Sequence, residues 1–90
     1  MINKDIKIAV VGCGWWGQNI IKTLKSDIGI SNVIGFDNSK TALNKVKNKF
    51  QIEITNTLED ITLNESINAV CIATPPSTHY TLSKVFLKHN

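Results

Sequence analysis

Apolar residues along the chain follow two patterns, short continuous runs and positions spaced as on one face of a helix. The continuous runs predict four strands, over residues 6–11, 31–36, 52–54 and 67–73. The helically spaced stretches predict helices over residues 15–25 and 40–50, and a last helix from Thr78. Strands and helices therefore alternate without repeats, which predicts a parallel sheet covered by helices on both faces.

The predicted fold is an α/β doubly wound (Rossmann) parallel sheet with the strand order 3-2-1-4, ending after the fourth strand and the helix that follows it. Right-handed crossovers place the first three strands on one side and the fourth strand on the other. The chain direction across the sheet thus reverses between the first and fourth strands. Because ligands of such sheets bind at this switch point, the loops after these two strands should line one crevice.

Two residues are predicted to cap helices. Ser39 is expected to cap the helix over residues 40–50. Thr57 is expected to cap a short helical turn with Asp60 three residues later. The apolar residues of this last segment are expected to face inward: Leu58, Ile61 and Leu63.

A glycine fingerprint, Gly12-Cys13-Gly14-Trp15-Trp16-Gly17, lies between the first strand and the first helix. In such a turn Gly12 turns the chain, Gly14 admits a pyrophosphate, and Gly17 lets the helix pack on the strand. The N-terminus of the helix supplies free N–H groups for the phosphates. The motif predicts a bound dinucleotide.

Asp37 supports this interpretation, because it follows the last glycine by about 20 residues and ends the second strand. A carboxylate there can accept two hydrogen bonds from the adenosine ribose hydroxyls. The alternative is a glycine-rich turn in which Asp37 only caps the next helix.

The composition of the chain limits which ligands and macromolecules it is expected to bind. The net charge of +3 comes from lysine alone, because the chain contains no arginine. Arginine is the side chain best suited to base edges and to a ribose 2′-phosphate, so nucleic-acid binding is not expected and NAD is preferred over NADP. Ser39 and Lys40 are the features that weaken this preference. The clustered lysines are expected to form the solvated face of a helix: Lys40, Lys45, Lys47 and Lys49.

The 90 residues suffice for one domain, residues 1–90, with 42% hydrophobic residues. No apolar stretch approaches the roughly 20 residues of a membrane helix, and polar residues interrupt the N-terminus, so a cytoplasmic protein is expected. Cys13 and Cys71 lack the spacing of a zinc site. Cys71 is expected to be a small hydrophobe. Cys13 is either a small residue between two glycines or a thiol activated by the helix N-terminus.

A second motif follows the fourth strand. Pro75 and Pro76 end this strand, Ser77 or Thr78 can cap the next helix, and His79 lies in its first turn. With the glycine fingerprint, extended through Gln18-Asn19, the segment Ala73-Thr74-Pro75-Pro76-Ser77-Thr78-His79-Tyr80 resembles the glucose-fructose oxidoreductase, inositol dehydrogenase and rhizopine catabolism (Gfo/Idh/MocA) family.

This resemblance covers the whole chain but only the cofactor domain of a family member, whose larger substrate domain and catalytic acid/base lie outside these residues. It places five residues around the pyrophosphate: Gly12, Gly14, Trp15, Trp16 and Gly17. It places Asp37 and Asn38 at the adenosine ribose. It places four residues near the remaining ribose and the nicotinamide: Thr74, Pro75, Pro76 and His79. His79 could act as an acid/base or fix its loop.

The expected function is therefore NAD(H) binding within an oxidoreductase that transfers a hydride to or from a sugar or nucleotide-sugar, with no catalytic residue in this chain. Two alternatives remain, a non-catalytic nucleotide-sensing module and a methyltransferase that binds S-adenosylmethionine. The two tryptophans cannot both point into one core. Either one borders the dinucleotide while the other meets a second domain, or one is core and the other incidental surface. An apolar edge at the fourth strand predicts self-association or a longer natural chain.

Overall fold

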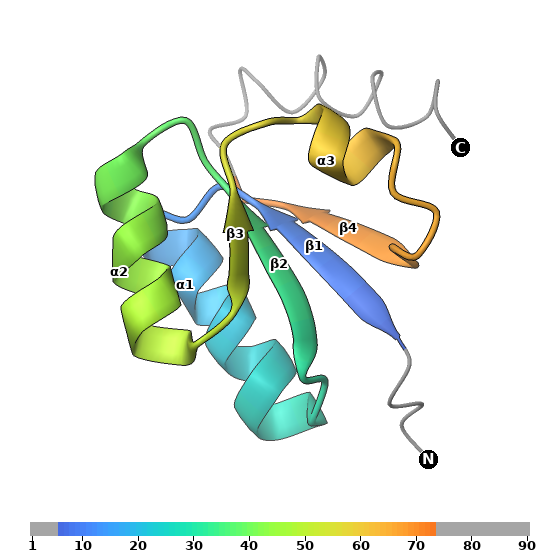
Figure 1. The fold of residues 1–90 in the computed structure, drawn as a ribbon. Helices are drawn as coiled ribbons and strands as arrows, with labels where there is room; N and C mark the ends of the chain where they lie inside the picture. The colour runs from blue at the N-terminus through green and yellow to red at the C-terminus, as the bar shows by residue number, and fades with distance from the viewer. Residues whose placement is uncertain (1–5, 74–90) are drawn as a thin grey trace.

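A computed structural model describes residues 6–73 of the chain. Its elements are β1 (Lys7–Val11), α1 (Trp15–Lys22), the π-helix η1 (Thr23–Ile28), β2 (Asn32–Phe36), α2 (Lys40–Phe50), β3 (Glu53–Thr55), α3 (Glu59–Thr62) and β4 (Ala69–Ile72). The four strands form one sheet in the order β3-β2-β1-β4, and all three pairings are parallel (Figure 1). The predicted doubly wound fold and strand order are confirmed. The helix predicted from Thr78 lies outside the described residues.

Side chains of β1 alternate between two core clusters, one on each face of the sheet. Ile8 and Val10 join the cluster that contains Ile21 of α1 and Val46 of α2. The opposite face carries the smaller cluster, which consists of Ala9, Val11, Ile34, Phe36 and Ile61 of α3. Figure 1 shows the same layering, with α1 and α2 on one side of the sheet and α3 on the other. Since β1 is buried on both faces, its carboxyl end is a fixed point of the fold.

The register of the sheet brings the ends of three strands together. Val11 at the end of β1 pairs with Phe36 at the end of β2 and with Ile72 at the end of β4. Beyond this row, the Gly12 N–H donates to the Phe36 carbonyl at 2.8 Å, and the Ala73 N–H donates to the Val11 carbonyl at 2.7 Å. The residues that follow β1 and β2 therefore lie side by side at one edge of the sheet.

The helices differ from their predicted bounds at one place. Helix α2 agrees at both ends with the prediction, and Ser39 caps it by accepting a hydrogen bond from the Ala42 N–H. The first helix, predicted to end at residue 25, continues as η1 to Ile28. It ends at Gly29, whose positive φ of 86° is readily accessible to glycine. Residues 26–30, which separate the predicted helix from the predicted second strand, are thus mostly helical.

The segment before β4 departs further from expectation. Thr57 does not cap α3, because the N-cap residue is Leu58 and no side-chain cap is formed there. The Asp60 carboxylate instead accepts a hydrogen bond from the Thr55 hydroxyl at 2.6 Å. Ile61 is buried and Leu58 half-buried, but Leu63 is 66% exposed, so its predicted inward orientation is wrong. Within residues 6–73, no helix has the length and apolar character needed to cross a membrane.

Candidate dinucleotide site

Two glycines of the fingerprint are required by the fold itself. Gly12 has a φ of 103°, in the region that side chains with a Cβ rarely adopt. Gly17 lies in the first turn of α1, where an added Cβ would overlap the Gly12 carbonyl oxygen and lie 2.8 Å from its carbon. The close approach of helix to strand therefore depends on Gly17, as its place in the motif predicts.

Gly14 is different, because nothing in the described chain requires a glycine there. Its φ of −75° and ψ of −160° are open to any residue. An added Cβ would find no described heavy atom within 4 Å. The space beside Gly14 is thus open at the point where a pyrophosphate would approach, and this geometry fits a bound dinucleotide.

The N-terminus of α1 begins at this open position. Its N-cap residue is Gly14, with no side-chain cap among the described residues and no acidic residue in its first turn. The first N–H groups of a helix lack partners within the helix, and the helix dipole favours an anion beside them. Helix α1 therefore offers backbone donors and a partial positive charge to a phosphate.

Cys13 fixes the glycine turn through burial and hydrogen bonds. Its side chain is fully buried, and its Sγ lies 3.5 Å from the Phe36 carbonyl oxygen in a weak hydrogen bond. Its carbonyl oxygen accepts a hydrogen bond from Gln18 Nε2 at 3.2 Å. Burial, and to a smaller extent the nearby Asp37 carboxylate, raises the pKa of the Cys13 thiol to about 12. The thiol is therefore protonated and inaccessible, and the interpretation of Cys13 as an activated thiol is wrong.

Asp37 lies directly after β2 and binds two backbone amides. Its Oδ2 accepts a hydrogen bond from the Cys13 N–H at 2.9 Å, and its Oδ1 accepts one from the Ser39 N–H at 2.9 Å. Since Ser39 caps α2, the alternative that Asp37 is itself the helix cap is wrong. A carboxylate has about four lone-pair positions, so each oxygen keeps one for a further donor. Asn38 lies exposed beside it.

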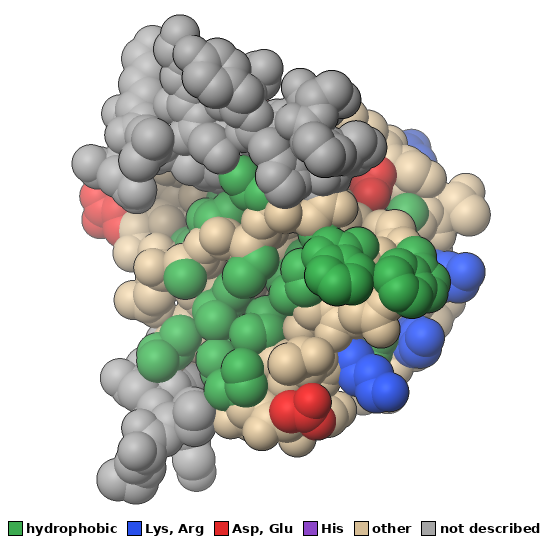
Figure 2. All heavy atoms as spheres, turned by 180° about the vertical axis from the view of Figure 1, so that it is seen from behind, with side chains coloured by type: hydrophobic (Ala, Val, Ile, Leu, Met, Phe, Trp, Pro, Cys, Tyr) green, Lys and Arg blue, Asp and Glu red, His purple; other side chains and the backbone are tan. Residues whose placement is uncertain are grey.

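Trp15 and Trp16 lie at the surface, 76% and 59% exposed, and neither is a core residue. Their rings stack on each other with centroids 5.7 Å apart and planes inclined by 29°. The alternative in which one tryptophan is buried in the core is wrong. Figure 2 shows hydrophobic side chains gathered on the face that is turned away from the viewer in Figure 1. The cofactor contacts expected of these rings stay a prediction.

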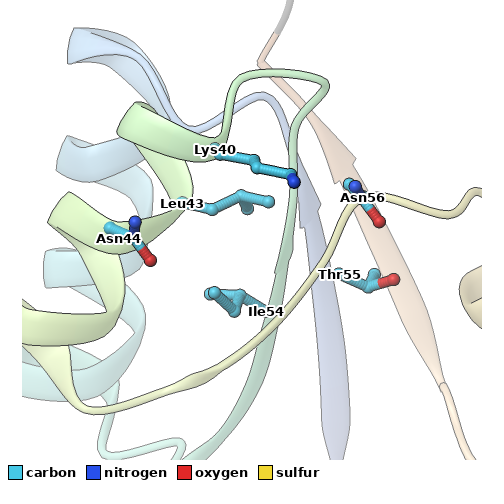
Figure 3. Close-up of a pocket in the computed structure, with 6 residues that line it drawn as sticks. All are labelled: Lys40, Leu43, Asn44, Ile54, Thr55 and Asn56. Atoms are coloured by element: carbon cyan, nitrogen blue, oxygen red, sulfur yellow. The ribbon is translucent and has the colours of Figure 1, made fainter.

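A separate hollow of about 230 Å³ lies between α2 and the end of β3. Its lining consists of Lys40, Leu43, Asn44, Ile54, Thr55 and Asn56. In Figure 3 the Lys40 side chain extends across it toward Asn56. The described residues predicted to bind the cofactor do not line this hollow, which is open to solvent. The candidate site is instead the surface around Gly14 and Asp37.

The structure thus brings the glycine turn and Asp37 together, as the motif spacing predicts. The second predicted group, Thr74, Pro75, Pro76 and His79, lies outside the described residues. Gln18 belongs to the extended fingerprint, but no role was predicted for it; its amide donates a hydrogen bond from α1 to the Cys13 carbonyl in the turn. Its position four residues after Gly14, within one helical turn of the fingerprint, is the signal that could have identified it.

Comparison with known proteins agrees with this geometry. A family model, GFO_IDH_MocA, described as an oxidoreductase family with an NAD-binding Rossmann fold, matches residues 6–90. No curated protein matches the chain.

Several solved structures share the fold. GenD2 from gentamicin A biosynthesis, in complex with NAD, is 21% identical with a TM-score of 0.87, over 99% of this chain and 26% of that protein. A myo-inositol dehydrogenase from Corynebacterium glutamicum is 18% identical with a TM-score of 0.80, over 94% and 26%. Biliverdin reductase from Synechocystis, in complex with biliverdin and NADP+, is 20% identical with a TM-score of 0.81, over 94% and 27%. The chain spans about a quarter of the length of these proteins.

Proposed function

The chain belongs to the Gfo/Idh/MocA oxidoreductase family, and from this premise we propose that it is the NAD(H)-binding part of a dehydrogenase for a sugar or nucleotide-linked sugar. One observation carries the cofactor part of this proposal. Gly14 has an ordinary backbone conformation, and within residues 6–73 no atom fills the space of its Cβ and no side chain caps the helix N-terminus beside it. A glycine that the described residues do not require is explained by a ligand that passes close to the backbone.

Different residues of the chain bind different parts of the cofactor. The first N–H groups of α1 bind the pyrophosphate, and Gly12 and Gly17 hold the turn in the shape that presents them. Asp37 accepts hydrogen bonds from the adenosine ribose through its two remaining lone-pair positions. Asn38, exposed beside Asp37, borders the same ribose.

We assign NAD rather than NADP as the preferred cofactor. The negative charge of Asp37 would repel a ribose 2′-phosphate, and the chain has no arginine to attract one. Lys40, at the first position of α2, is the nearest compensating cation in the sequence. A bound NADP+ in biliverdin reductase shows that the same fold accepts the phosphorylated cofactor in a distant relative.

The remaining contacts of the proposal rest on the family. Trp15 and Trp16 would border the pyrophosphate as an exposed aromatic pair. Thr74, Pro75, Pro76 and His79 would border the second ribose and the nicotinamide. When bound, the cofactor supplies a hydride acceptor or donor, and the proton of the substrate hydroxyl would be exchanged by a residue outside this chain. Self-association and a cytoplasmic location stay predictions.

The test is a titration of the 90-residue chain with NAD, NADH, NADP and S-adenosylmethionine. Emission of the two tryptophans reports ligands at the N-terminus of α1, and calorimetry gives the affinity independently of the probe. The proposal expects both forms of NAD to bind and NADP to bind more weakly. Binding of S-adenosylmethionine alone would replace the dehydrogenase assignment by a methyltransferase. A flat response to all four ligands by both methods would remove the cofactor assignment.

A further inference from the structure

We infer that Asp37 has a second task, as a positioning residue that holds the glycine turn in its phosphate-binding shape. The link to cofactor binding rests on the proposed function, whereas the hold on the turn rests on the hydrogen bonds alone. One carboxylate would then couple the ribose end of the site to its pyrophosphate end.

The register of β1 and β2 explains how this contact arises. The last paired residues are Val11 and Phe36, and the Gly12 N–H still donates to the Phe36 carbonyl. The N–H of the next residue, Asp37, faces the other neighbouring strand and donates to the Thr55 carbonyl of β3 at 3.4 Å. The Asp37 side chain remains close to the end of β1, where its Oδ2 accepts a hydrogen bond from the Cys13 N–H at 2.9 Å. The side chain extends the hydrogen bonding of the sheet one residue into the turn.

This bond fixes the residue immediately before Gly14. Cys13 is held through its N–H by Asp37, through its thiol against the Phe36 carbonyl, and through its own carbonyl by Gln18. The bond to Asp37 is the one with an ionised acceptor, and such bonds are shorter and about twice as strong as neutral ones. With Cys13 fixed, the direction of the N–H groups that follow it is set before a phosphate arrives. The other oxygen of Asp37 holds the Ser39 N–H, so the same carboxylate ties together the starts of α1 and α2.

Inorganic pyrophosphate separates this task from the ribose contact, because it has no ribose. If Asp37 acts only on the ribose, Asp37→Asn removes a negative charge near an anion and pyrophosphate should bind equally or more tightly. If Asp37 positions the turn, the variant should bind pyrophosphate about tenfold more weakly, since the two backbone N–H groups bind different oxygens of the carboxylate and asparagine replaces one of these oxygens by an NH2 donor. Asp27→Asn is the matched control, because it removes the same charge at an exposed position in η1 and should leave the affinity unchanged. Equal or tighter binding by Asp37→Asn would overturn the inference.

A second measurement uses the unmodified chain and so does not depend on the folding of a variant. In protein labelled with ¹⁵N and ¹³C, a scalar coupling across the hydrogen bond should connect the Cys13 amide nitrogen with the Asp37 carboxyl carbon. The Cys13 amide should also exchange with solvent about tenfold more slowly than in Asp37→Asn. An absent coupling, with Cys13 exchanging as fast as an exposed amide, would overturn the inference.

The two proposals fail in different ways. Binding of NAD by a chain that lacks the coupling would leave the cofactor assignment intact and remove the positioning role of Asp37. A coupling in a chain that binds neither pyrophosphate nor NAD would remove the cofactor assignment and, with it, the role of Asp37 in presenting the turn to a phosphate.

Discussion

Helices α1 and α2 begin at the same edge of the sheet, yet their N-termini are built in opposite ways. Helix α2 satisfies its own first turn, because the Ser39 hydroxyl accepts a hydrogen bond from the Ala42 N–H at 3.2 Å. Helix α1 begins at Gly14, without a side-chain cap in the described structure and with open space where a cap would project. Loss of a serine or threonine cap typically costs about 1 kcal/mol. Helix α1 lacks this stabilisation in the described structure. Its N-terminus is also where the glycine fingerprint predicts a ligand.

The two ends also differ in how firmly the preceding residue is held. Cys13, before the open end, is buried and hydrogen-bonded on three sides. Ser39, at the capped end, is exposed. The end of α1 without a cap is therefore held firmly by the residue that precedes it. No side chain in the described part of the chain caps its first N–H groups, but the turn before them is held by hydrogen bonds to Cys13.

The largest expected effect concerns the buried anchor of the open end. A pKa raised from 9.0 to about 12 lowers the thiolate fraction of Cys13 near neutral pH by about a thousandfold. Iodoacetamide should therefore label Cys13 about a thousandfold more slowly in the folded chain than in urea, with Cys71→Ser used to isolate its signal. Labelling at a similar rate in both states would show that the turn opens freely, contrary to this account.

Gly17→Ala should destabilise the start of α1 far more than the same methyl group added at Gly14. The new Cβ would meet the Gly12 carbonyl, a backbone group that cannot rotate away. We expect the free energy of unfolding in urea to fall by about 3 kcal/mol. Gly14→Ala is the matched control, which adds the same methyl group three residues earlier. Equal stability of the two variants would contradict the described packing of helix on strand.

Gly14→Ala should instead separate binding from stability. Its Cβ meets no described atom, and the entropy gain of alanine in place of glycine is offset by the poorer N-cap preference of alanine, so stability should change by less than about 1 kcal/mol. The same methyl group would enter the space assigned to the pyrophosphate. NAD affinity measured by calorimetry should fall by about 2 kcal/mol, or roughly thirtyfold. Unchanged affinity would mean that the ligand does not pass Gly14.

Ser39→Ala tests the capped end and should give the smallest effect. Removal of the hydroxyl that caps α2 should lower the free energy of unfolding by about 1 kcal/mol. The affinity for pyrophosphate should not change, because that ligand is assigned to α1. A large loss of pyrophosphate binding in Ser39→Ala would show that the two helix ends do not act separately.

Patterns of short range account for most of the fold. The apolar runs located all four strands to within two residues, and the alternation of strands and helices with right-handed crossovers predicted the switch point between β1 and β4. The bounds of α2 and its Ser39 cap also follow from local signals. Predictions at the level of the turn chemistry were weaker. Thr57 and Asp60 have the spacing of a capping box. In the structure the Asp60 carboxylate accepts a hydrogen bond from the Thr55 hydroxyl instead, and Leu58 rather than Thr57 is the N-cap residue of α3.

The contacts that complete the candidate site were beyond sequence reasoning because they depend on register. Whether Asp37 reaches Cys13 is decided by the pairing of Val11 with Phe36, which no local pattern specifies. The burial of Cys13 follows from the same pairing, and therefore its raised pKa does too. Trp15 and Trp16 stack on each other at the surface. The sequence predicts contacts of these rings with a core, a cofactor or a second domain, but not a contact between the two rings.

The most direct test of the account is a map of backbone amide shifts on adding NAD to the ¹⁵N-labelled chain. The account predicts the largest shifts at the start of α1, over Gly14, Trp15 and Trp16, and smaller ones at the start of α2, where Ser39 already satisfies the Ala42 N–H. Saturable shifts at α1 would support the assignment of the uncapped end to the pyrophosphate. Shifts centred on Ala42, or none at millimolar NAD, would contradict it.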